Sequence, residues 1–227
     1  MSAFHTAVYP DRVEMLTDGA VYRNDGTLIG IQEKVWRSSD IPLAITCRGD
    51  MRTAGVLIPS ILRVASAGSF DLMIELLPDI LARGKQRGVP AGRDFEIVIA
   101  GISETTGPFT AYLTSTKYQE GVDAWTLLNM GTDFGGGMAL TESELAALGD
   151  IGPETSLEDI GVPLFEAMRR KKGPNPCRPD LPSLFGIGGH VDWTVVDADG
   201  ARTRRLHTWP DKVGEKIDPF AADAVAA

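Results

Sequence analysis

The chain has 227 residues, 43% of them hydrophobic, and a formal net charge of −9. This composition is typical of a globular protein with a sizeable core, and the negative charge disfavours nucleic acid as a partner because phosphates would be repelled. Two cysteines, Cys47 and Cys177, are too few for a disulfide framework and favour a reducing compartment. No secretory signal opens the chain and no apolar run is long enough to span a bilayer, so the sequence predicts a cytoplasmic protein without a membrane partner.

Short apolar segments separated by turns fill the first fifty residues. Tyr9–Arg12 separates two strand-like runs, and Asn24-Asp25-Gly26 is typical of a β-hairpin turn. Because these segments are close in sequence, we expect them to pair as antiparallel strands.

Two helices are predicted next, over residues 50–66 and 69–83, from apolar residues recurring at a helical period. Pro59 lies inside the first and Pro78 inside the second. Proline removes a backbone donor and clashes with the preceding turn, so each should kink its helix or break it in two.

The second half repeats this order of strands and then helices. Strands are expected over residues 95–102, 109–116 and 125–130, with the glycines at 135–137 ending the block. Thr141 and Glu144 form a capping box that begins a short helix, and a longer helix is expected over residues 156–172.

The chain closes with two predicted strands, 191–196 and 202–209, and an alanine-rich tail that should fray after about residue 219. The basic run 169–172 at the end of the preceding helix is interpreted as a solvated helix end, with an interface role as the alternative. No internal repeat or second domain is visible, so residues 1–227 should form one domain. Blocks of strands and blocks of helices indicate an α+β fold, and two facing sheets with helix pairs outside, a four-layer αββα sandwich, would bury every apolar face.

Three residues at regular intervals carry the chemistry that the sequence suggests. Ser2 becomes the first residue if Met1 is removed, and it then holds a hydroxyl nucleophile and an α-amine base on one residue. An ordinary α-amine has a pKa of about 7.7–8.0, so part of it is a neutral base near physiological pH. Asp18 and Lys34 follow at equal intervals, where strand ends return to the start of the first strand. A buried Lys34 would lower the pKa of the amine and the hydroxyl, and Asp18 would hold the lysine.

The segments around these residues, FHTAVYP, RVEMLTDGAVY, TLIGIQEKVW and PLAITCRGD, resemble the opening of a proteasome β-subunit or its bacterial HslV-type relative, in the N-terminal nucleophile hydrolase superfamily. That family has its nucleophile, aspartate and lysine at the same separations. The resemblance implies the αββα sandwich, hydrolysis of amide or peptide bonds by Ser2, and a homo-oligomeric ring. The sequence specifies neither the substrate, the ring size nor any ATPase partner.

The resemblance also implies an oxyanion hole made by backbone N–H groups of the turn that contains Arg48 and Gly49. Arg48 stands where the family usually has glycine, which would narrow the pocket or put a cation in it. Leu184 and Ile187 fall where the family has an aspartate and a serine near the nucleophile.

The family's mid-chain serine-glycine turn is matched only loosely, by Met130-Gly131-Thr132-Asp133. Thr132 or Asp133 is the candidate for orienting the amine in its place. These departures favour an alternative, a non-catalytic assembly subunit that keeps the fold, as proteasome α-subunits do.

Other motifs suggest no cofactor and no metal. The three glycines at 135–137 lack the Gly-Lys-Ser/Thr of a phosphate loop, and His5, His190 and His207 have no metal-ligand spacing. Cys47 with His5 would be an alternative nucleophile and base, but Cys47 lies in an apolar strand and is expected to be buried.

Overall fold

The computed structural model describes residues 2–66, 68–131, 133–174 and 180–221. It is a mixed α+β fold with several antiparallel sheets and few helices, as the alternating blocks of strands and helices predict. Within these residues, no helix has both the length and the apolar character needed to cross a membrane. The tail predicted to fray lies mostly at 222–227, outside the described residues.

The strands of the described residues form two five-stranded sheets and one hairpin, and all of them pair antiparallel. The first sheet has the order β10 (Asp133–Gly136), β1 (Phe4–Val8), β2 (Val13–Asp18), β11 (His190–Asp197) and β12 (Gly200–Thr208). The second has the order β5 (Val35–Arg37), β6 (Leu43–Gly49), β7 (Phe95–Ser103), β8 (Gly107–Thr114) and β9 (Leu128–Asn129). The hairpin joins β3 (Ala20–Tyr22) to β4 (Leu28–Ile31) through the predicted turn, where Gly26 has a φ of 85° that glycine adopts without strain.

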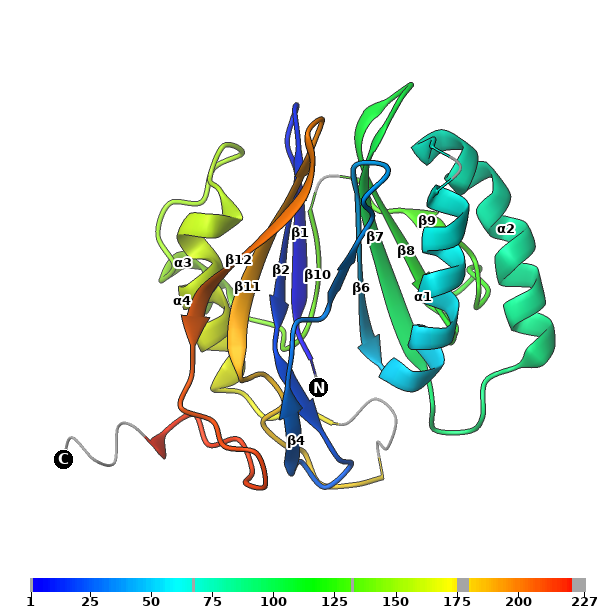
Figure 1. Cartoon of the computed structure of the whole chain (residues 1–227). Helices are drawn as coiled ribbons and strands as arrows, with labels where there is room; N and C mark the ends of the chain where they lie inside the picture. Colours follow the sequence, from blue (N-terminus) through cyan, green and yellow to red (C-terminus); the bar gives the residue numbers. More distant parts are fainter. Residues whose placement is uncertain (1, 67, 132, 175–179, 222–227) are drawn as a thin grey trace.

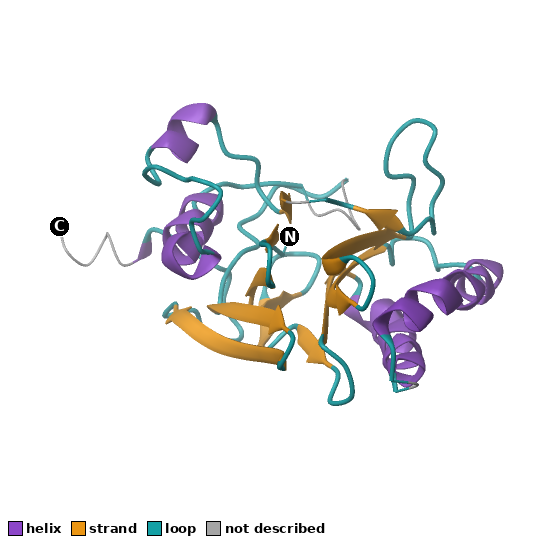
Figure 2. Ribbon diagram, turned by 90° about the horizontal axis from the view of Figure 1, so that it is seen from above, coloured by secondary structure: helices purple, strands orange, loops and turns teal. Residues whose placement is uncertain are grey.

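The helices lie on opposite sides of the molecule, with the two large sheets between them (Figures 1 and 2). On one side, α1 (Met51–Ala65) and α2 (Phe70–Arg87) pack on the second sheet. On the other side are α3 (Glu142–Ala146) and α4 (Leu157–Arg169), and α4 packs on the first sheet. A third apolar cluster, which includes Phe4, Met15, Val98 and Tyr112, joins the facing sides of the sheets.

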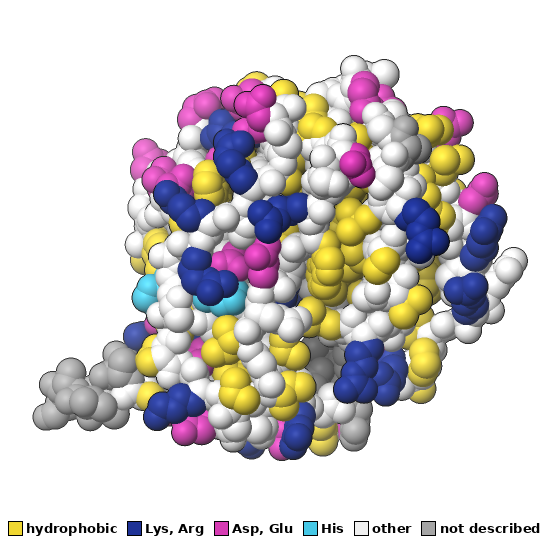
Figure 3. Space-filling view, viewed as in Figure 1, with side chains coloured by type: hydrophobic (Ala, Val, Ile, Leu, Met, Phe, Trp, Pro, Cys, Tyr) yellow, Lys and Arg dark blue, Asp and Glu magenta, His cyan; other side chains and the backbone are white. Residues whose placement is uncertain are grey.

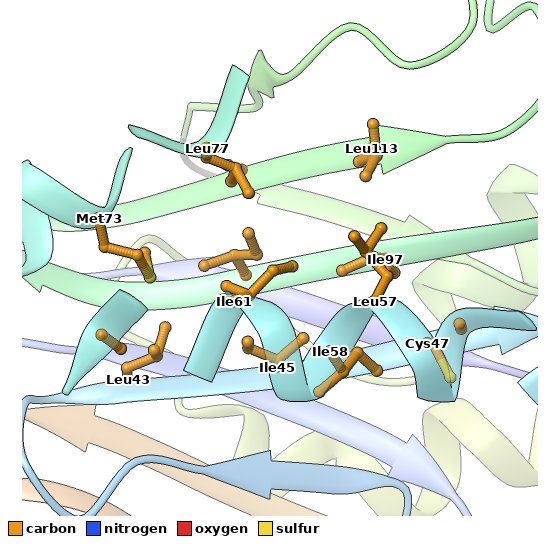
Figure 4. Close-up of a cluster of buried hydrophobic side chains, with 14 of the residues drawn as sticks. Leu43, Ile45, Cys47, Leu57, Ile58, Ile61, Met73, Leu77, Ile97 and Leu113 are labelled. Atoms are coloured by element: carbon orange, nitrogen blue, oxygen red, sulfur yellow. The ribbon is translucent and has the colours of Figure 1, made fainter. Parts of the chain in front are cut away.

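Helical periodicity explains how α1 and α2 pack. Leu57, Ile58 and Ile61 of α1 meet Met73 and Leu77 of α2 above the strands, in the cluster shown in Figure 4. Asp50 and Ser69 cap the two helices, each accepting a hydrogen bond from a backbone N–H of the first turn.

Two features of the secondary structure differ from the sequence prediction. Neither helix is broken at Pro59 or Pro78: both prolines lie on exposed faces, and the apolar stripes hold each helix together through them. Strand β10 was not predicted, because Gly135 and Gly136 give no β signal. A side chain at either position would collide with His5 or Phe4 of β1, so glycine allows this strand to pair closely.

Arg169 also corrects the interpretation of its basic run as a solvated helix end. Its side chain is buried, and its guanidinium forms a bidentate ion pair with Asp211, at 2.6 and 2.9 Å. The following Arg170 is exposed, as the sequence predicts.

Candidate active site

Ser2, Lys34 and Asp18 lie together, as predicted from their spacing. The ammonium Nζ of Lys34 donates to Ser2 Oγ at 2.8 Å and to Asp18 Oδ1 at 2.8 Å. Lys34 and Asp18 are both buried, with 1% and 0% exposure, whereas Ser2 is half-buried. A charge-assisted hydrogen bond to Ser2 Oγ stabilises negative charge that develops on this oxygen, so the geometry suits a nucleophile reached from outside the protein.

Asp18 accepts four hydrogen bonds. Oδ1 accepts from Lys34 Nζ and from the Ala3 N–H at 3.1 Å, and Oδ2 accepts from the N–H groups of Ala20 at 3.1 Å and Gly188 at 3.3 Å. These four donors replace the water from which the buried carboxylate is excluded. The carboxylate therefore compensates the buried charge of Lys34.

Strand ends bring the three residues to one place. Phe4 pairs with Thr17, so the residues before β1 meet the end of β2 at Asp18. Lys34 directly precedes β5, and its carbonyl accepts from Thr46 Oγ1 of β6 at 2.8 Å. The site thus joins the first sheet to the second.

A second buried ion pair supports the loop that reaches Asp18. Arg169 donates to the carbonyl of Ile187 at 2.8 Å, and Asp211 accepts from the N–H of Gly189 at 2.7 Å. Gly188, which donates to Asp18, lies between these two contacts. Neither Asp211 nor Gly188 was predicted to support the site; the glycine-rich segment before β11 was the available signal for a close backbone approach.

Arg48 and Gly49 end β6, opposite Glu96 and Phe95 of β7. The Arg48 guanidinium pairs with Glu96 at 2.7 Å and lies over the Phe4 ring, 5.6 Å from its centroid. Gly49 has a φ of 90°, and a side chain there would collide with the carbonyl of Asp94. Among the described residues no hydrogen bond joins either N–H to Ser2, and their oxyanion role stays a prediction.

Other candidates from the sequence lie elsewhere. Asp133 pairs with Ala7, toward the far end of β1 from Ser2, so it cannot orient the amine as suggested. Thr132 lies outside the described residues. In this part of the chain Gly137 lies next to the N-terminal segment, because a Cβ at Gly137 would be 3.1 Å from the Cβ of Ala3.

Leu184 and Ile187, where the resembling family has an aspartate and a serine, form hydrogen bonds through their backbones and not through their side chains. Leu184 exchanges backbone hydrogen bonds with Gly173, and Ile187 is buried and offers its carbonyl to Arg169. Neither side chain can donate or accept a hydrogen bond.

Cys47 and His5 are not brought together. Cys47 packs in the apolar cluster under α1, and burial raises the pKa of its thiol to about 12 despite the nearby charge of Lys34. The His5 ring packs against Gly135 of β10, and burial lowers its pKa. A protonated thiol in an apolar core is a poor nucleophile, so Ser2 is the better candidate.

Comparison with known proteins gives no match, either to a protein family or to a curated protein. The chemistry is therefore inferred from the cluster itself. A hydroxyl, a buried ammonium that donates to it and a carboxylate that holds the ammonium suit nucleophilic attack on a carbonyl when a base accepts the hydroxyl proton.

Proposed function

We propose that this protein is a proteasome-like N-terminal nucleophile hydrolase, in which Ser2 cleaves amide bonds once the bond between Met1 and Ser2 has been cut. The observation that carries the proposal is the position of Lys34 Nζ, which is 2.8 Å from Ser2 Oγ and 2.8 Å from Asp18 Oδ1.

The arrangement of the layers supports this proposal. Two antiparallel sheets, with α1 and α2 beside one and α4 beside the other, fit the αββα sandwich that the resemblance implies. In that fold the nucleophile is the first residue and directly precedes the first strand. Ser2 has the same position relative to β1.

The proposed reaction begins when Ser2 Oγ attacks the carbonyl carbon of the amide and its proton passes to the Ser2 amine. The amine gives that proton to the leaving nitrogen as the C–N bond breaks, which leaves the acyl group as an ester on Ser2. Water then hydrolyses the ester and restores the hydroxyl. Lys34 stabilises negative charge on Oγ, and Asp18 holds the ammonium in place.

Ser2 variants test the proposal with a panel of short peptide amides that release a fluorophore. Ser2→Ala should reduce hydrolysis by on the order of 10⁶-fold, to background, because the nucleophile is lost. Ser2→Thr keeps a hydroxyl and is the matched control, which should retain activity. Hydrolysis that persists in Ser2→Ala, or in protein whose Met1 is retained, contradicts the mechanism.

A second candidate is a non-catalytic assembly subunit. It is favoured by the guanidinium of Arg48 over Phe4, and by Ile187 where the family has a serine. An assembly subunit tolerates a blocked Ser2 amine, whereas the hydrolase requires a free one. The mass of the N-terminal peptide separates the two candidates.

A further inference from the structure

A groove between α1 and α2 is bordered by a concentration of arginines. Its volume is about 590 Å³, within the range of sites that bind small organic molecules. Among the described residues no aspartate or glutamate lines it, whereas five arginines do: Arg52, Arg63, Arg83, Arg87 and Arg93. We call this surface the arginine groove.

Helical spacing places these arginines on the helix faces that border the groove. Arg83 and Arg87 are four residues apart on α2, so their side chains are neighbours on one face of that helix. Arg52 and Arg63 lie about three helical turns apart on α1 and therefore share a face as well. Like charges four residues apart destabilise a helix. An anion bound between the two helices would offset that repulsion.

The arginines of the groove are largely free of ion pairs. Arg93 contacts Asp50 at 3.4 Å, and the other four make no ion pair with the part of the chain that the structure describes. In a chain with a net charge of −9, so many unpaired cations around one groove give it a local potential opposite to that of the whole molecule. Figure 3 shows dark-blue side chains spaced over the side of the molecule that holds α1 and α2, with hydrophobic side chains among them.

The floor of the groove is apolar and includes an indole that its neighbours hold in place. Val56, Ile80 and Trp125 contribute to it. The Trp125 ring meets the Phe95 ring edge to face, with 5.4 Å between the centroids, and a side chain at Gly84 would collide with it. Trp125 also has a φ of 68°, the one positive φ among the described residues other than glycine, and such strain persists where the surroundings fix a residue. A fixed indole is a surface on which a flat ring can stack.

Cations around an apolar floor define the chemistry of a matching ligand. A guanidinium forms paired hydrogen bonds with phosphate oxygens, and several arginines around one groove suit negative charges that lie close together, as they do on a di- or triphosphate. The apolar floor and the indole suit an aromatic ring joined to those phosphates. An acidic peptide carries its carboxylates on separate residues, so it is less well matched to arginines gathered around a volume of this size.

We infer that the arginine groove binds a nucleoside di- or triphosphate, with the phosphates on the arginines and the base on the floor beside Trp125. The net negative charge of the chain disfavours long nucleic acids, but it does not oppose a small ligand confined to one basic groove. This inference does not depend on the hydrolase activity. Binding is measured without an amide substrate, so either proposal can fail alone.

Isothermal titration calorimetry of the full chain with ATP, in the presence of EDTA, tests the inference. We expect saturable binding of one ATP per chain, which weakens as the ionic strength rises. AMP should bind more weakly than ATP because it carries fewer charges, and inorganic triphosphate should bind more weakly because it lacks a ring. An acidic peptide that contains tyrosine is the competing ligand of different chemistry.

Two charge reversals in the last turn of α2 form a matched pair of variants. Arg87→Glu removes a cation that lines the groove, whereas Lys85→Glu makes the same change of charge at a residue that does not line it. Both residues are exposed, so circular dichroism should show both variants folded. Arg87→Glu should raise the dissociation constant for ATP by on the order of tenfold or more. Lys85→Glu should raise it by less than about threefold, because only screened long-range repulsion is added.

A variant of the floor tests the place of the base. Trp125→Leu should weaken the binding of ATP and leave the binding of inorganic triphosphate unchanged, because only the stacking surface is lost. If this variant does not fold, the comparison of Arg87→Glu with Lys85→Glu decides the matter alone.

The inference is overturned if ATP shows no saturable binding at low ionic strength, or if Arg87→Glu and Lys85→Glu have equal effects. Inorganic triphosphate that binds as tightly as ATP would show a plain anion site and would overturn the assignment to nucleotides. Binding of the acidic peptide in place of ATP would assign the groove to a protein partner and overturn the inference as well.

Discussion

Two of the buried ion pairs among the described residues, Arg169 with Asp211 and Lys34 with Asp18, are connected through one loop but arranged differently. Arg169 with Asp211 is bidentate, and Arg169 also donates to a backbone carbonyl and lies over the Trp209 ring, 4.8 Å from its centroid. Lys34 with Asp18 is a single contact, and the lysine gives another hydrogen bond to the half-buried hydroxyl of Ser2.

This difference suggests different roles for the two ion pairs. We call Arg169 with Asp211 the structural pair and Lys34 with Asp18 the chemical pair. The partners of Arg169 are an internal ion-pair partner, a main-chain carbonyl and a ring, which fix α4 and the segment around Asp211 to the Ile187–Gly189 loop. A lysine ammonium is a compact charge that can follow a reacting oxygen, and Lys34 has such an oxygen as its neighbour. Damage at the first pair should appear as lost stability, and damage at the second as lost activity.

Removal of the lysine should have the largest effect. Lys34→Ala should lower amide hydrolysis by on the order of 10⁴-fold, because residues that act as a unit lose function together. Asp18 keeps three backbone donors, so the fold should survive. Initial rates with the fluorogenic amides, beside a thermal melt, measure both effects; a folded Lys34→Ala enzyme with wild-type rates would contradict the proposed mechanism.

Truncation of the structural pair should mainly cost stability. Asp211→Ala leaves the buried guanidinium of Arg169 without its partner, so the free energy of unfolding should fall by about 3–5 kcal/mol. The double variant Arg169→Met with Asp211→Leu removes both charges and should recover part of the loss. Urea denaturation measures this, and equal stability of Asp211→Ala and wild type would show that the pair does not hold the loop.

The sequence predicted the chemical pair and missed the structural one, for a physical reason. Ser2, Asp18 and Lys34 stand at strand ends in a fixed register, so their spacing carries information. Arg169 meets Asp211 only after α4 and the end of the chain have packed, and Gly188 acts through a backbone N–H that any residue possesses. The α+β class followed from the order of elements. Strand β10 did not, because Gly135 and Gly136 are required there only by the close approach of His5 and Phe4 of β1.

The same substitution at the two aspartates compares the two ion pairs directly, with a smaller expected effect on activity than the removal of Lys34. Asp18→Asn turns an acceptor into a donor beside Lys34, and misplacement of the ammonium should reduce activity by about 10²-fold. Asp211→Asn should reduce activity less and stability more, because its partner is Arg169. Hydrolysis rates and melting temperatures of Asp18→Asn and Asp211→Asn test this comparison. A larger loss of activity in Asp211→Asn and a larger loss of stability in Asp18→Asn would contradict the roles given to the two pairs.

Mildly alkaline pH should produce the smallest effect, through the buried thiol of Cys47, which lies within the electrostatic influence of Lys34. Burial raises the pKa of the folded Cys47 thiol from 9.0 to about 12. The unfolded thiol loses its proton first, so stability should fall as the pH rises from about 9 toward 12. Burial also raises the pKa of Tyr9 to about 12, which acts in the same direction. Cys47→Ala should therefore show a shallower decline of stability with pH, measured by urea denaturation; an unchanged slope would mean that the thiol is not shielded as described.

Intact mass spectrometry with an electrophilic probe tests the central claim most directly. The purified protein is incubated with a serine-reactive fluorophosphonate, weighed, and then digested to locate the adduct. We expect a chain that begins at Ser2 and carries one adduct on Ser2, with none on Ser2→Ala and an undiminished yield on Cys47→Ala. An adduct on Cys47, or no adduct on a chain with a free Ser2 amine, would contradict the account.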